Sequence, residues 1–319
     1  MSQERPRNDG VEDERPPLSD ALTAFAQGLP RSPHLARLSD LDRQEARDLT
    51  DAWPLLPVAT REAIVRGMDE LAESNFALNF GRALRVALDD GSPVVRQLAV
   101  AALWEDDQAD LLARYLVIAR RDPSVDVRAA AVRGLTRFAG QGAAGDLDEA
   151  TTDELRQLLL ALADDEREPE FLRRRALEAI GVFGQEPRVR ELIRSAYESD
   201  QEGLRAGALS AMGSSCDHRW LDVVLAASRS PDAEIRYEAA RACGTLGDDR
   251  AVPELVELAD DHDVEVRHAA IAGLGALGSK AASNALRGLG AEARESDREL
   301  IEEALDEATL TLSPLRAAL

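Results

Sequence analysis

The chain has 319 residues, 45% of them hydrophobic and 31% charged, which is enough apolar content for a sizeable buried core. Acidic residues outnumber basic ones by 60 to 38, and the net charge of −22 repels nucleic acid and anionic membranes at long range. Two cysteines, Cys216 and Cys243, are too few for a disulfide framework. No secretory signal is evident at the N-terminus, and no apolar stretch approaches the roughly 18 residues that span a bilayer. We therefore expect a cytoplasmic protein.

The N-terminal part is predicted to contain a tail and a helical cap. Residues 1–17 are rich in charge and proline, which predicts a disordered acidic tail. The segment LSDALTAFAQG (18–28) predicts a short helix. Residues 40–75 predict an atypical helix pair, in which Trp53 anchors the cap. We therefore assign residues 18–74 to an N-terminal helical cap.

The rest of the chain repeats one arginine-marked phrase with a period near 31 residues. An aliphatic residue precedes most of these arginines, and an alanine and then a larger apolar residue follow it at the fourth and eighth positions. This spacing places the apolar residues on one face of a helix, and the small alanine lets a neighbouring helix approach closely. The arginines that mark the phrase are Arg96, Arg128, Arg173, Arg205, Arg236, Arg267 and Arg298.

A second apolar helix and a tight turn precede each phrase, as in residues 109–120, 187–199 and 251–260. The repeating unit is therefore helix, turn, helix. A pair this short cannot bury its own apolar face, so it has to stack on its neighbours. The pattern over residues 75–310 predicts an all-α solenoid of about seven to eight stacked antiparallel helix pairs.

The phrase resembles the HEAT-repeat family, of the short type also found in phycobilin-lyase-like proteins. The matching segments are DPSVDVRAAAVRGL (122–135) and DHDVEVRHAAIAGLG (261–275), and the resemblance covers roughly residues 75–310. It implies a right-handed, armadillo-like superhelix whose second helices line the concave side. It leaves the function open, because many unrelated roles share this scaffold.

The resemblance also implies a structural ladder that ties adjacent repeats, formed by the repeated arginine and an acid six positions before it. Four pairs follow this spacing: Asp90–Arg96, Asp122–Arg128, Asp261–Arg267 and Glu292–Arg298. Other residues stand in place of the acid in the middle of the array. We expect the ladder to be broken there, at Arg167, Ser199 and Ser230.

An insertion and the C-terminal end depart from the period. Residues 139–153 (AGQGAAGDLDEATTD) fall in the one long gap between repeats and predict a flexible loop. This loop is either a neutral insertion or an arm that contacts a partner. Asp297 and Ile301 replace the expected apolar residue and alanine in the last phrase, as in a capping repeat. Residues 311–319 are expected to form a C-terminal tail.

A concave groove is the first candidate binding surface. The residue after each ladder arginine and the one four positions further are expected to face outward there. A cluster of arginine and tyrosine in such a groove would dock an acidic segment of a protein or peptide partner. Alternatively, the arginines only neutralise neighbouring glutamates. The candidate groove residues are Arg133, Arg174, Glu178, Tyr237, Arg241 and His268.

A second row of arginines recurs two residues after an acid, at Arg188, Arg219 and Arg250. The acids stand at helix N-cap positions. The arginines form either a recognition ridge or salt bridges between repeats. Trp220 and Trp104 belong to the same candidate ridge, and each either binds a partner or fills a gap between irregular repeats. Trp104 stands where the phrase usually ends in glycine.

The sequence shows no pattern for catalysis or metal binding. The segment CDH (216–218) has no second ligand cluster at metal-binding spacing, and the His-Glu dipeptides of HEAT-like iron hydroxylases are missing. We expect no catalytic residue, metal or cofactor. The leading hypothesis is a non-enzymatic scaffold or adaptor that binds a protein or peptide partner along its concave surface. The alternatives are a phycobilin-lyase-like or other accessory enzyme and, against the net charge, a nucleic-acid-binding protein.

Overall fold

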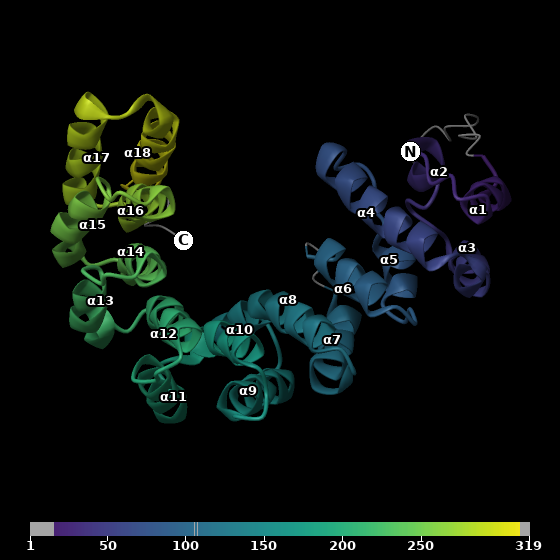
Figure 1. Cartoon of the computed structure of the whole chain (residues 1–319), viewed down its shortest axis with the longest axis horizontal. Helices are drawn as coiled ribbons and strands as arrows, with labels where there is room; N and C mark the ends of the chain where they lie inside the picture. The colour runs from purple at the N-terminus through teal and green to yellow at the C-terminus, as the bar shows by residue number, and fades with distance from the viewer. Residues whose placement is uncertain (1–15, 105, 107, 313–319) are drawn as a thin grey trace, which may run out of the picture. The chain divides into compact units, whose positions relative to one another are not determined.

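The computed structural model describes residues 16–104, 106 and 108–312. The predicted acidic tail lies outside these residues apart from its last two, and the predicted C-terminal tail apart from its first two. Within them the chain is helical, without any strand, and its helices pack neighbour to neighbour, which confirms the all-α solenoid (Figure 1). None of the described helices is long and apolar enough to cross a lipid bilayer.

The chain divides into two compact units between Gln108 and Ala109. Unit 1 contains the residues expected to form the cap and also the first repeat. The short helix expected at 18–28 corresponds to α1, and the pair expected at 40–75 corresponds to α3 and α4. The helices of unit 1 are α1 (Leu18–Ala26), α2 (Ser32–Ala36), α3 (Arg43–Ala52), α4 (Val58–Ser74), α5 (Gly81–Ala87) and α6 (Pro93–Ala102).

Unit 2 holds six further helix pairs. Its second helices, α8 to α18 in even numbers, lie along the inner side of the unit's curve, and α9 to α17 in odd numbers lie along the outer side (Figure 1). The helices are α7 (Ala109–Arg121), α8 (Val125–Ala144), α9 (Glu149–Asp164), α10 (Glu170–Ile180), α11 (Pro187–Tyr197), α12 (Glu202–Ser214), α13 (Leu221–Ala227), α14 (Ala233–Leu246), α15 (Val252–Leu258), α16 (Val264–Leu277), α17 (Lys280–Glu292) and α18 (Arg298–Leu312).

The prediction of a flexible loop at residues 139–153 is wrong. Helix α8 continues to Ala144 and α9 begins at Glu149, so the extra residues lengthen two helices. The glycines of this segment are tolerated because α8 is packed through the buried Phe138. The chain turns at Gly145, whose φ of +85° suits glycine, and Asp148 caps α9 by accepting a hydrogen bond from the amide of Thr151 at 3.0 Å.

The apolar positions of the repeated phrase form the core of unit 2. The phrase alanines and the larger residues four positions later are fully buried in all five repeats from α8 to α16. These residues are Ala131, Ala176, Ala208, Ala239 and Ala270, followed by Leu135, Ile180, Met212, Cys243 and Leu274. One continuous core therefore runs through the unit, as the period predicts.

Glycines hold the backbones of successive second helices close together. Each of these glycines stands eight positions after a ladder arginine. A Cβ atom placed on it would lie 2.7 to 3.0 Å from a Cα atom in the next second helix, closer than side chains tolerate. We call these contacts the glycine seam. They are Gly181 with Ala211, Gly213 with Ala242, Gly244 with Gly273, and Gly275 with Ala304.

Replacing Gly244 by alanine is expected to lower the free energy of unfolding by about 1 to 3 kcal/mol, because the added methyl group would overlap the backbone of α16. The matched control is Gly288 on α17, where an added Cβ meets no atom within 4 Å. Gly288→Ala should raise the free energy of unfolding by up to about 1 kcal/mol, through the higher helix propensity of alanine. Urea unfolding measures both changes, and a stabilised Gly244→Ala variant would contradict the seam.

Candidate functional site

Four of the ladder arginines bind the turn that precedes their own helix. Their guanidinium groups each donate a hydrogen bond to the backbone carbonyl six positions earlier, at distances from 2.8 to 3.1 Å. The contact predicted within a repeat therefore uses the carbonyl of the acid and not its carboxylate. The donors and acceptors are Arg96 with Asp90, Arg128 with Asp122, Arg236 with Ser230, and Arg267 with Asp261.

The carboxylate that pairs with the arginine comes from the following repeat. Arg236 binds both oxygens of Asp261, at 2.7 and 2.9 Å. Its hydrogen bonds hold the pKa of Asp261 below the usual value of 3.8. The same relation joins Arg267 to Asp297, Arg128 to Glu168 and, in unit 1, Arg61 to the buried Asp90. The ladder thus connects neighbouring repeats through ion pairs in which both side chains are largely buried.

Serine at the acid position keeps the turn and loses the ion pair. The hydroxyls of Ser199 and Ser230 each accept an amide hydrogen bond at 3.1 Å, as Asp261 does in its own turn at 2.8 Å. Since serine carries no charge, neither Arg173 nor Arg205 has a ladder carboxylate. Arg173 donates to the carbonyl of Ala163 and to the side-chain oxygen of Gln201, both at 3.2 Å, and Arg205 lies 3.8 Å from Glu202 of its own helix.

The prediction of a third break in the ladder, at Arg167, is wrong. The neighbouring Glu168 supplies the carboxylate for Arg128, while Arg167 pairs with Asp165 at 2.8 Å. The acid that pairs with Arg128 therefore stands one residue later than the repeated spacing predicts. For the pair Glu292–Arg298, the side chain of Glu292 lies outside the described residues.

The inner-face arginine Arg174 forms an ion-pair network that spans three helices. From α10 it donates to Glu178 on its own helix at 2.8 Å and to Glu234 and Glu238 on α14. The side chain of Arg174 reaches α14 by crossing α12 at Gly207. A Cβ atom added to Gly207 would lie 2.9 Å from the Cγ atom of Arg174. Burial raises the pKa of Glu238, so its charge depends on these arginine partners.

Of the other candidate groove residues, Arg241 and Tyr237 lie together, whereas His268 and Arg133 lie apart from them. Arg241 donates to Glu238 at 3.2 Å, and its guanidinium carbon lies 5.7 Å from the ring centre of Tyr237. His268 lies apart, 3.4 Å from Asp297. Arg133 is exposed and has no ion pair within the described part of the chain. For Arg174 and Arg241 the geometry therefore matches the alternative in which arginines neutralise neighbouring glutamates.

A hollow of about 280 Å³ lies beside Tyr237, between the N-terminal turns of α14 and α16. Three acids line it together with Ala233: Glu234, Asp263 and Glu265. Of these acids, Glu234 is paired with Arg174, whereas Asp263 and Glu265 have no ion pair among the described residues.

The second row of arginines makes salt bridges. Arg188 binds Asp164 of the preceding repeat at 2.7 Å, and Arg250 lies 3.6 Å from Asp222 of the preceding repeat. Arg219 binds Asp217, two residues before it, at 2.7 Å. Two of the three thus join repeats, and each of the three is engaged by an acid of the chain itself.

The acids before these arginines all stand at the predicted N-cap positions. Asp217 and Asp248 accept the amide hydrogen bond two residues later, at 3.2 and 3.0 Å. Hydrogen bonds from Arg250 lower the pKa of Asp248 to about 2. Glu186 makes no such bond and pairs with Arg156 instead.

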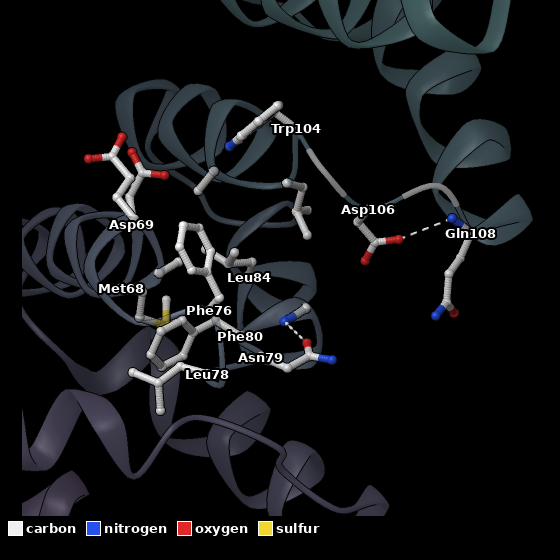
Figure 2. Close-up of a pocket in the computed structure, with 15 residues that line it drawn as sticks. Met68, Asp69, Phe76, Leu78, Asn79, Phe80, Leu84, Trp104, Asp106 and Gln108 are labelled. Carbon is white, nitrogen blue, oxygen red and sulfur yellow. Dashed lines mark hydrogen bonds between the residues drawn. The ribbon is translucent and has the colours of Figure 1, made fainter. Parts of the chain in front are cut away.

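The two ridge tryptophans lie in different environments. Trp220 is buried in the core, whereas the side chain of Trp104 is 64% exposed at the end of α6. Trp104 lies at a depression in unit 1 with Phe76, a residue that the sequence analysis missed (Figure 2). Phe76 belongs to a short connection outside the repeat phase, so periodicity gave no signal for it.

Neither the two cysteines nor the potential metal-binding side chains form a reactive site within the described residues. Cys243 is fully buried, and burial raises the pKa of its thiol to about 12. Cys216 is exposed, with a φ of 49°. Across the described ranges, no three or more histidine, cysteine, aspartate or glutamate side chains are arranged to hold a metal ion.

Comparison with known proteins identifies the repeats. Residues 221–306, from α13 into α18, match the family model described as HEAT repeats, which confirms the resemblance. No curated protein matches the chain. Among solved structures, the complex of CpcE and CpcF of phycocyanin lyase from Nostoc sp. PCC7120 has a TM-score of 0.50 at 16% identity, over 97% of this chain and 99% of that chain. At this identity the likeness shows the solenoid fold alone.

Two further structures are similar at lower scores. Escherichia coli YibA has a TM-score of 0.44 at 17% identity, over 75% of this chain and 96% of that chain. Human deoxyhypusine hydroxylase, in complex with glycerol, has a TM-score of 0.35 at 17% identity, over 83% of this chain and 96% of that chain.

The ladder makes a pH-dependent contribution to stability. Because the pKa of Asp261 is lower in the folded state, its contribution is present above pH 3.8 and is lost as the pH falls through the folded-state pKa. Asp261→Asn is expected to lower the free energy of unfolding by about 1.5 to 3 kcal/mol at neutral pH, and to reduce the loss of stability in acid.

The control for this variant is Glu191→Gln, which removes an exposed ion pair with Arg188. It should change the free energy of unfolding by less than about 1 kcal/mol. Urea unfolding between pH 3 and pH 7 measures both variants. An Asp261→Asn variant as stable as the control at every pH would show that the ladder does not stabilise the array.

Proposed function

We propose that this HEAT-repeat solenoid is a non-enzymatic scaffold that binds a protein partner along the inner face of unit 2. The observation that carries the proposal is the continuity of that face. The second helices pack side by side from α8 to α18, and the glycine seam brings those from α12 to α18 into backbone contact, so that their outward side chains form one surface. A surface of this kind suits an extended partner segment better than a small molecule.

The inner face favours a partner with charges of both signs. The acidic segment predicted from the sequence needs an available arginine, and Arg133 meets this need because it is exposed and not paired within the described ranges. Asp263 and Glu265 beside Tyr237 favour a basic residue, whose aliphatic part would also pack on the tyrosine ring. We infer that the partner places an acidic residue near α8 and a basic one near α14.

The test compares an inner-face variant with an outer-face variant of the same composition. The inner variant is Arg133→Glu with Tyr237→Ala. The matched control is Arg188→Glu with Tyr197→Ala, both on the outer helix α11. Each protein is used for affinity purification from the native host, with identification by mass spectrometry, and the recovered partner is then titrated in purified form.

We expect the wild type and the outer control to retain the partner, and the inner variant to bind it at least about tenfold more weakly, the size of a hot-spot loss. Equal binding by both variants would contradict a role of the inner face. Recovery of no stable partner, together with turnover of a small molecule, would contradict the scaffold itself.

A further inference from the structure

Unit 1 exposes two large aromatic side chains at one depression. Phe76 is 88% exposed and Trp104 is 64% exposed, in a chain whose aromatic content is only 4%. Both residues line a depression of about 590 Å³. Exposed aromatic side chains gathered at a concave site are typical of protein interaction surfaces.

The depression has an apolar floor. Figure 2 shows Phe76, Phe80 and Leu78 gathered near Met68 and Leu84. Met68, Phe80 and Leu84 are buried, so the floor is part of the packed core and is firm. Among its apolar lining residues, Phe76 and Trp104 are the exposed ones, and they supply the apolar area that a partner would cover.

The connection that carries Phe76 is held in place by hydrogen bonds. The amide of Asn79 donates to Ser39 at 2.9 Å, and its carbonyl accepts from the amide of Asp40 at 2.8 Å. The side chain of Asn79 accepts from the amide of Gly81 at 2.9 Å. Phe76 is therefore presented by a fixed backbone, which lowers the entropy that binding has to overcome.

The rim of the depression is acidic on one side. Asp69 and Glu73 lie one turn apart on α4 and line the depression. Neither has an ion pair among the described residues, whereas Asp106 across the depression is bound by Arg85 at 3.1 Å. Burial and the neighbouring Glu73 and Glu70 raise the pKa of Asp69 above its usual value.

We propose that this aromatic depression, lined by Met68, Asp69, Glu73, Phe76, Phe80 and Trp104, binds a segment of a protein partner with an apolar anchor flanked by basic residues. The anchor packs between the two exposed rings, above the apolar floor. Lysine or arginine beside it pairs with the carboxylates of Asp69 and Glu73 and lies near the ring of Trp104. This surface is separate from the inner face of unit 2, and the two binding proposals do not depend on each other.

Trp104 itself reports binding. Trp53 and Trp220 are buried, so quenching of tryptophan fluorescence by acrylamide arises mainly from Trp104. The probe is a blocked peptide, KRLLFLLKR, which contains no tryptophan. The charge-reversed peptide EDLLFLLDE has the same apolar core and controls for apolar association alone. We expect the basic peptide to protect Trp104 from quenching, with a salt-dependent affinity, and the acidic peptide to leave quenching unchanged.

Three variants test the assignment. Phe76→Ala should weaken the binding of the basic peptide at least about tenfold, although it leaves the charge of the protein unchanged. Asp69→Asn with Glu73→Gln should weaken this binding and also make it less dependent on salt. Phe171→Ala, which truncates a half-exposed phenylalanine in unit 2, should bind as the wild type does. Since Phe76 and Glu73 are exposed and Asp69 is only half-buried, all three variants should keep the wild-type circular dichroism spectrum.

The proposal is overturned if Trp104 stays equally accessible with the basic peptide, or if the acidic peptide protects it as well. It is also overturned if Phe76→Ala binds like Phe171→Ala. These results do not depend on the inner-face variants, so the two binding surfaces are tested separately.

Discussion

Backbone contact between successive second helices is the constraint on which the rest of unit 2 depends. At Gly213, Gly244 and Gly275 the next helix lies so close that a side chain cannot be placed between them. This contact sets the distance between repeats, and the other interactions follow from that distance. The guanidinium of Arg236 reaches Asp261 of the next repeat, and Arg174 reaches across a whole helix.

The glycine seam and the ladder do not stabilise the same junctions between repeats. The ladder is interrupted where serine replaces the acid, at Ser199 and Ser230, but the turn and the glycine contact persist there. The middle repeats thus lack the ladder ion pair and are joined by apolar packing and by other ion pairs, such as Arg174 with Glu234 and Arg188 with Asp164. The repeats near the C-terminal end keep the ladder ion pairs as well. The inner face remains continuous across this change, which is what a long binding surface requires.

The repeat arithmetic predicted the fold because each position in the phrase has one physical role. Alanine and the larger apolar residues are buried, and the glycine eight positions after the arginine lies at the seam. Interactions outside the period were not predictable in this way. The path of Arg174 depends on Gly207 in another repeat, and Phe76 belongs to a connection without a repeat position. The segment 139–153 was mistaken for a loop because its glycines outweighed the packing of Phe138, which only the structure reveals.

Hydrogen exchange along a urea series, read by mass spectrometry, tests most directly whether the seam joins the repeats. If backbone contact couples α12, α14 and α16, their slowly exchanging amides should open in one cooperative step, with the same free energy and the same urea dependence. Opening of α14 or α16 alone, at its own urea concentration and while its neighbours stay protected, would contradict this account.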